Sequence, residues 1–229
     1  FKRLENAFSL LKENAPVQHI LEESYFYNDK FFTPPGVFIP RPESELIIDC
    51  VNNDFSFFEK KTVLDIGSGS GCLSISLGKL YKDFSITGID ISHKAIEVSR
   101  KNAKRLNASN VKFVNKDFFN INLTLFDIII SNPPYIAISE INNLDDSVSK
   151  HDPLIALSDQ FDGLSFYKYF IDNIDYMLKK DGTMYLEIPN SNITDKIIDI
   201  VNKKPNITNE IFKDFEGNNR VIKIYFNTK

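Results

Sequence analysis

Short apolar segments typical of buried strands alternate with longer amphipathic segments along most of this chain. The clearest strand contains the run Ile128-Ile129-Ile130, which suits a strand covered on both faces. Strands are predicted at residues 62–66, 85–90, 111–115, 126–131, 183–188, 207–214 and 220–226. Helices are predicted at residues 4–13, from about residue 43, and at 70–80, 93–106, 163–179 and 192–203. This alternation predicts an α/β fold, in which helices cover both faces of a mostly parallel sheet.

The segment before the first of these strands has a different character. Residues 24–39 are rich in aromatic side chains and carry the turn signals Asn28-Asp29 and Pro34-Pro35-Gly36, which predict a small β-hairpin or loop. We therefore expect an N-terminal helix and hairpin in residues 1–42 and a main domain in residues 43–229. The sequence begins with Phe1 and not with Met, so we expect further residues upstream.

Composition narrows the classes of partner. The formal net charge is −4, whereas a protein that grips DNA or RNA broadly needs a basic surface, so no direct nucleic-acid partner is expected. Neither Cys50 nor Cys72 has a second Cys or a His at metal-ligand spacing, so no metal site is predicted. The chain shows no membrane-spanning apolar run and no signal peptide. We expect a cytoplasmic monomer.

A glycine-rich turn joins the strand at residues 62–66 to the following helix. It reads Leu64-Asp65-Ile66-Gly67-Ser68-Gly69-Ser70-Gly71. Glycines at such a turn allow the backbone to approach a ligand closely. Dinucleotide-binding turns have a glycine where this chain has Cys72, so a nicotinamide cofactor is disfavoured.

Polar and aromatic side chains follow the next two strands. The second strand ends at Asp90, whose carboxylate can accept hydrogen bonds from both hydroxyls of a ribose. The third strand is followed by Asp117 and Phe118, which are candidates to flank an adenine ring by hydrogen bonding and stacking, although Phe118 also suits a place in the core. With the glycine-rich turn, these residues predict a site for a nucleoside-bearing cofactor.

The fourth strand ends in the motif Asn132-Pro133-Pro134-Tyr135. Each proline fixes its own φ angle and restricts the residue before it, so this segment is rigid and extended. It lies at the carboxyl edge of the predicted sheet, where ligands bind in folds of this class. The motif therefore predicts a rigid catalytic loop.

The chemistry of that loop follows from its hydrogen-bond acceptors. An amide or aromatic amino nitrogen is a poor nucleophile because its lone pair is delocalised. The side-chain oxygen of Asn132 and the carbonyl of Pro133 can accept its two N–H groups and turn the lone pair toward a methyl donor, while Tyr135 can pack on the flat group. Methyl transfer then depends on position and electrostatics, without a strong base.

With these motifs in place, the chain resembles the HemK/PrmC family, the release factor glutamine methyltransferases, over nearly its whole length from about Pro16. Besides the glycine-rich turn and the Asn-Pro-Pro-Tyr motif, three segments carry the resemblance: Ile39-Pro40-Arg41-Pro42-Glu43-Ser44-Glu45, Asp162-Gly163-Leu164 with Tyr167, and Glu216-Gly217-Asn218-Asn219-Arg220. The Asn-Pro-Pro-Tyr motif is shared with adenine and cytosine amino methyltransferases. The Pro-Arg-Pro and Asp-Gly-Leu segments are more specific.

The resemblance implies a Rossmann-like seven-stranded sheet with an antiparallel final strand. It implies S-adenosyl-L-methionine as the cofactor, held by residues 67–71, Asp90 and Phe118, and Asn132 in contact with both cofactor and substrate. The implied substrate and partner is a peptide chain release factor, methylated on the glutamine of its Gly-Gly-Gln loop. Residues 1–42 would be a remnant of the family's larger substrate-docking domain.

The sequence departs from the family at several positions. His151-Asp152-Pro153 stands where an aromatic residue, Glu and Pro are usual, Pro189 replaces a usual Gly, and Phe118 replaces a common Trp. Two other substrates stay open, namely adenine in nucleic acid and a glutamine of a ribosomal protein. A non-catalytic cofactor-binding protein is disfavoured by the intact Asn132 and glycine-rich turn.

Overall fold

The computed structural model describes residues 2–120, 124–189 and 192–227 of the chain. Within this part, seven strands form one sheet in the order β5-β4-β3-β6-β7-β9-β8. The strands β3 to β7 run parallel, and β9 is antiparallel to both of its neighbours. Their bounds are β3 Thr62–Ile66, β4 Ser85–Asp90, β5 Val111–Asn115, β6 Phe126–Ser131, β7 Leu178–Glu187, β8 Ile207–Lys213 and β9 Asn219–Phe226.

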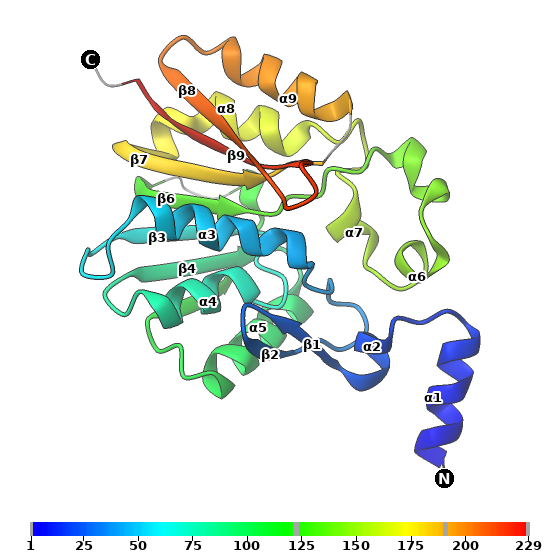
Figure 1. Ribbon diagram of the computed structural model, residues 1–229. Helices are drawn as coiled ribbons and strands as arrows, with labels where there is room; N and C mark the ends of the chain where they lie inside the picture. The colour runs from blue at the N-terminus through cyan, green and yellow to red at the C-terminus, as the bar shows by residue number, and fades with distance from the viewer. Residues whose placement is uncertain (1, 121–123, 190–191, 228–229) are drawn as a thin grey trace.

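Helices cover the sheet in two layers (Figure 1). One face carries α3 (Glu45–Asp54), α4 (Cys72–Leu80) and α5 (His93–Arg105), and the other carries α8 (Ser165–Met177) and α9 (Asn192–Asn202). Strand β6 shows why both faces are buried, since Ile128 and Ile130 pack into the core beneath α3 and α4 whereas Ile129 packs beneath α8 and α9. The predicted α/β fold, with its antiparallel strand, is confirmed.

The predicted start of β7 was wrong. Periodicity predicts this strand from residue 183, but the structure begins it at Leu178, which pairs with Phe126 of β6. The pairing then shifts before Ile128 meets Thr183, so the intervening residues form an irregular stretch that has no strand periodicity to read. The helix predicted from about residue 43 begins as the short turn η1 (Pro42–Ser44) and continues as α3. Other short helices were missed, because too few residues define a helical period. They are α2 Val17–Leu21, α6 Asp146–Ser149, α7 Leu154–Leu157, η2 Phe118–Asn120 and η3 Ile138–Asn143.

The N-terminal segment forms the predicted helix α1 (Lys2–Lys12) and the predicted hairpin of β1 (Glu23–Phe26) and β2 (Asp29–Phe32). The hairpin is attached to α5 by Asn102, which is fully buried; its Oδ1 accepts from Phe32 N at 2.8 Å and its Nδ2 donates to Phe32 O at 3.0 Å. Helix α1 instead lies away from the sheet (Figure 1). The hairpin therefore packs on the main body, whereas α1 makes few contacts with it.

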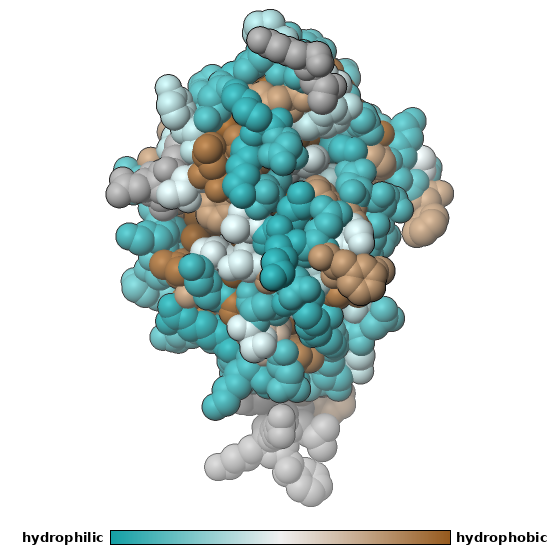
Figure 2. Space-filling model, turned by 90° about the vertical axis from the view of Figure 1, so that its left-hand side faces the viewer, coloured by the Kyte–Doolittle hydropathy of each residue, from teal (hydrophilic) through white to brown (hydrophobic). Residues whose placement is uncertain are grey.

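Figure 2 shows the edge of the molecule at the amino ends of the parallel strands, where hydrophilic side chains predominate. Phe58, in the loop before β3, is 91% exposed on the described surface. No helix in the described ranges is both long and apolar enough to cross a membrane. The cavity described next lies at the opposite, carboxyl edge of the sheet.

Candidate active site

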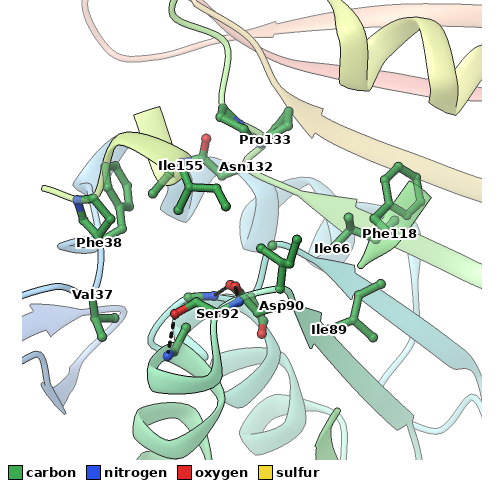
Figure 3. A pocket seen from close by; sticks show the side chains of 18 of the residues that line it. Val37, Phe38, Ile66, Ile89, Asp90, Ser92, Phe118, Asn132, Pro133 and Ile155 are labelled. Atoms are coloured by element: carbon green, nitrogen blue, oxygen red, sulfur yellow. Dashed lines mark hydrogen bonds between the residues drawn. The ribbon is translucent and has the colours of Figure 1, made fainter. Parts of the chain in front are cut away.

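A cavity of about 300 Å³ opens at the carboxyl ends of β3, β4 and β6. Its floor is the glycine-rich turn and the end of β4, and the loops after β5 and β6 form its sides (Figure 3). Two further segments complete the wall, around Phe38 and around Ile155. The cavity is in the size range of small-molecule sites and at the edge where such folds bind ligands.

The glycines of the glycine-rich turn have two different roles, open space beside the backbone and close packing. Gly67 and Gly69 have φ angles of +72° and +53°, and a Cβ atom on either would meet nothing within 4 Å. Their backbone therefore borders open space that a ligand can enter. At Gly71, whose φ is +83°, a Cβ would lie 2.8 Å from the ring of Phe113. Gly71 thus allows α4 to pack closely, and it does not line the cavity, whereas Ser68 and Ser70 do.

Asp90 connects this turn to the start of α5. Its Oδ2 accepts from Gly69 N and its Oδ1 from Ser92 N, each at 2.8 Å. Burial raises the pKa of the Asp90 carboxyl, and these two backbone donors oppose that shift. Each oxygen keeps a further lone pair and Asp90 lines the cavity, so the carboxyl can both order the turn and accept from a ligand hydroxyl.

Phe118 both lines the cavity and belongs to the core. It is 5% exposed, and its ring lies parallel to that of Phe166 at 6.2 Å and edge-on to Tyr169 at 4.8 Å. The neighbouring Asp117 accepts from Phe119 N at 3.0 Å and from Asn120 Nδ2 at 2.6 Å. The aromatic cluster therefore provides a flat apolar wall. The Asp117 carboxylate accepts two hydrogen bonds from its own turn and so stabilises that turn.

The Asn-Pro-Pro-Tyr loop leaves the sheet beside the glycine-rich turn. Ser131 Oγ donates to Ile66 O at 2.7 Å and so joins the ends of β6 and β3. Asn132, Pro133 and Pro134 line the cavity. Figure 3 shows Asn132 and Pro133 at its upper side. Tyr135 does not; its hydroxyl points behind the loop and donates to Glu187 Oε1 at 3.3 Å. The predicted site residues are thus brought to one edge, with Tyr135 behind the others.

Glu187, the last residue of β7, lies beneath this loop and is 2% exposed. Ser44 Oγ donates to its Oε2, and Tyr167 OH donates to its backbone oxygen at 2.6 Å. Burial raises the pKa of the Glu187 carboxyl to about 7, against the opposing effects of Ser44, Tyr135 and Arg220. A buried carboxyl therefore supports the loop from below.

Comparison with known proteins identifies the family. Residues 57–225 match a family described as a methyltransferase domain. The release factor glutamine methyltransferase of Bacillus subtilis is 35% identical over 96% of this chain and 78% of its own length. The chain belongs to the release factor glutamine methyltransferase family.

Other relatives agree with this assignment. The release factor glutamine methyltransferase of Thermodesulfovibrio yellowstonii is 37% identical over 77% of this chain, and the match spans 64% of that relative's length. Among solved structures, a methyltransferase from Pyrococcus furiosus superposes with a TM-score of 0.64 at 19% identity, covering 96% of this chain and 98% of the other. That likeness supports the fold.

The Pro-Arg-Pro segment at residues 40–42 forms part of the cavity wall. Arg41 Nη2 lies 2.5 Å from Asp152 Oδ2, and the guanidinium sits 5.0 Å from the Phe38 ring centroid. Burial raises the pKa of the Asp152 carboxyl, and the Arg41 cation opposes that shift. Asp152 thus joins the segment around Phe38 to the one around Ile155.

The Asp162-Gly163-Leu164 segment supports the Asn-Pro-Pro-Tyr loop. Gly163 has a φ of +78°, and a Cβ there would lie 2.2 Å from Tyr135 O. Asp159 holds this turn in place, since its carboxylate accepts from Gly163 N at 3.0 Å and from Ser165 N at 2.9 Å. Glycine is therefore required where the turn presses against the backbone of Tyr135.

Sequence reasoning missed four residues of this site. Phe38 and Ile155 line the cavity, but they lie in segments far apart in the sequence that the Arg41–Asp152 ion pair joins, so no local pattern indicates them. Ser44 and Glu187 had a weak signal. Glu187 ends a buried strand at the same sheet edge as Asp90, and a carboxyl at such a strand end is the pattern that could have indicated it.

Proposed function

We propose that this protein transfers a methyl group from S-adenosyl-L-methionine to the side-chain amide nitrogen of the glutamine in the Gly-Gly-Gln loop of a peptide chain release factor. The observation that supports this most is the position of Asn132. Its amide nitrogen donates to Ser44 Oγ at 2.9 Å, which turns its oxygen away from Ser44. Among the described residues none donates to that oxygen, and Asn132 lines the cavity.

The cavity fits the proposed cofactor. The open backbone at Gly67 and Gly69 can receive the methionine part, and the free lone pairs of Asp90 suit ribose hydroxyls. The aromatic wall at Phe118 suits an adenine ring. When bound, S-adenosylmethionine supplies an activated methyl group on sulfur.

The residues of the loop would then act on the substrate amide. Asn132 Oδ1 and the carbonyl of Pro133 accept the two N–H groups of the glutamine, which orients its nitrogen lone pair toward the methyl. The bound cofactor would supply the methyl group to this nitrogen. The proton that the nitrogen loses in exchange would leave along one of the two hydrogen bonds, to Asn132 Oδ1 or to the carbonyl of Pro133, and pass from there to solvent. Rigid placement and two acceptors lower the barrier without a base. The apolar wall at Phe38 and Ile155 limits water at the reacting atoms.

A methyl-transfer assay distinguishes the candidate substrates. Purified protein and labelled cofactor are incubated in parallel with release factor, with ribosomal protein and with DNA. We expect one methyl group on the release factor, and none after the Gly-Gly-Gln glutamine is replaced. Label in DNA with none in release factor would favour adenine, and label only in ribosomal protein would favour a glutamine there.

Asp90→Ala should weaken binding of the cofactor by about 1 to 3 kcal/mol, as for a lost hydrogen bond to a charged group. The change also removes the acceptor for Gly69 N, so the glycine-rich turn loses order. Titration calorimetry with S-adenosylmethionine measures the effect. Asp83→Ala, at an exposed carboxylate between α4 and β4, is the matched control and should bind normally. Equal affinities for the two variants would remove Asp90 from the site.

We also propose that residues 1–42 retain a role in docking the release factor, and that this role is concentrated in α1. Phe8 is 62% exposed there and Leu11 46%. Deletion of residues 1–14 should leave cofactor affinity unchanged, because the hairpin and the cavity wall remain. It should raise the Michaelis constant for the release factor severalfold. A truncated protein with an unaltered Michaelis constant would contradict the docking role.

A further inference from the structure

A continuous chain of hydrogen bonds leads from Glu187 to Asn132. Asn132 Nδ2 donates to Ser44 Oγ at 2.9 Å, and Ser44 Oγ donates to Glu187 Oε2. The link spans three separate elements, namely the loop after β6, the turn η1 and the end of β7. Ser44 is 3% exposed and Glu187 is 2% exposed, so water does not compete for these bonds.

The chemistry of the three groups sets a single donor-to-acceptor direction for this series of hydrogen bonds. An ionised carboxylate only accepts hydrogen bonds, so the single hydroxyl proton of Ser44 is directed to Glu187. Ser44 Oγ can then only accept from Asn132, which must present its NH2 group. The amide oxygen of Asn132 is thereby left facing away from Ser44, where a substrate N–H group needs an acceptor.

We propose that Glu187 acts through Ser44 as a positioning residue, fixing which end of the Asn132 side-chain amide faces the methyl acceptor. The inference rests on the proposed function for its catalytic consequence. An Asn132 turned by half a rotation would point NH2 at the substrate amide, so donor would face donor and the nitrogen lone pair would not be oriented. The two orientations have nearly the same shape, so packing alone does not distinguish them.

The surroundings of Glu187 make this direction sensitive to pH. Tyr135 and Tyr167 donate to the residue from the loop and from α8. The Arg220 cation on β9 favours the charged carboxylate, whereas Glu43 on η1 disfavours it. Protonation of Glu187 gives it a donor, which allows Ser44 to direct its proton to Asn132 instead. With the pKa of Glu187 raised to about 7, turnover should rise as pH increases through that value.

Substitution of Ser44 tests the link by activity. Ser44→Ala should lower kcat for release factor by about tenfold or more, while the Michaelis constant and cofactor affinity change by less than about threefold. Ser44→Thr keeps the hydroxyl and should recover most of the turnover. Ser56→Ala, an exposed serine before β3, is the control for a simple loss of a hydroxyl. Wild-type kcat in Ser44→Ala would overturn the proposal.

The pH profile tests Glu187 itself. Wild-type kcat should show a limb that rises through about pH 7. Glu187→Gln keeps the shape of the side chain but does not titrate, so this limb should disappear. An unchanged limb in Glu187→Gln would assign the titration to another group and overturn the role of Glu187.

A measurement without substrate separates this inference from the proposed function. The side-chain NH2 resonance of Asn132 in ¹⁵N-labelled protein is assigned by its loss in Asn132→Ala. It should shift with pH through about 7 in the wild type and stay constant in Ser44→Ala and Glu187→Gln. If the wild type methylates no release factor, the proposed function fails while this resonance still decides the inference. The same titration in wild type and Ser44→Ala would overturn it.

Discussion

Asn132→Ala should turn over release factor at least about a hundredfold more slowly than the wild type, because a well-placed hydrogen bond at the reacting group is lost. Asn132 lines the cavity, and Ser44 holds its amide nitrogen at 2.9 Å. The truncation removes the acceptor and leaves the glycine-rich turn and Asp90 in place. Cofactor affinity should therefore change much less than kcat.

Single-turnover kinetics and cofactor calorimetry check this prediction together. Asn53→Ala, at an exposed position of α3, is the matched control and should behave as the wild type. Asn132→Asp keeps an oxygen acceptor but has no NH2 to donate to Ser44, and it places a second carboxyl near the buried Glu187. It should therefore be slow as well. Near-normal turnover in Asn132→Ala would exclude Asn132 from the chemistry.

Gly163→Ala should both destabilise the protein and lower its kcat, although Gly163 is outside the Asn-Pro-Pro-Tyr loop. A left-handed conformation costs an L-residue about 1 to 2 kcal/mol. The new Cβ would in addition lie 2.2 Å from Tyr135 O, a backbone atom that cannot rotate away. We expect a total loss of roughly 2 to 4 kcal/mol in the free energy of unfolding.

The effect of Gly163→Ala on turnover follows from that contact. Relief of the clash must move the backbone of Tyr135, and the rigid prolines transmit the movement to Asn132. A shift of about 1 Å at reacting groups can cost on the order of a hundredfold in rate. Gly163→Ala should therefore be slow even where it is fully folded, as chemical denaturation and kinetics under the same conditions will show.

Gly217→Ala is the matched control for backbone conformation. Gly217 has a φ of +85°, but a Cβ there would meet nothing within 4 Å. It should lose only the roughly 1 to 2 kcal/mol of the left-handed conformation and keep its turnover. If Gly163→Ala and Gly217→Ala lose equal stability and equal activity, the close approach of Gly163 to Tyr135 does not affect turnover, and the prediction is wrong.

Local patterns in the sequence determined the fold class and the order of most strands and helices. The alternation of buried strands with amphipathic helices has a single common solution, a parallel sheet covered on both faces. The same patterns place Asp90 and Asn132 at strand ends on one edge, since parallel strands end together. The glycine-rich turn and the Asn-Pro-Pro-Tyr motif could be recognised from the sequence. The stiffness of the prolines and the lack of a side chain on the glycines are local properties, which do not depend on the tertiary structure.

Only the tertiary structure decided what surrounds those motifs. Ser44 and Glu187 are separated by 143 positions along the chain, yet one hydrogen bond joins them beneath Asn132. The Arg41–Asp152 ion pair likewise closes the cavity wall across 111 positions. Side-chain direction and burial depend on how distant elements pack. The sequence by itself therefore indicated Asn132 as the acceptor that we propose for the substrate amide, and the packing of η1 and β7 decided how its side chain is oriented.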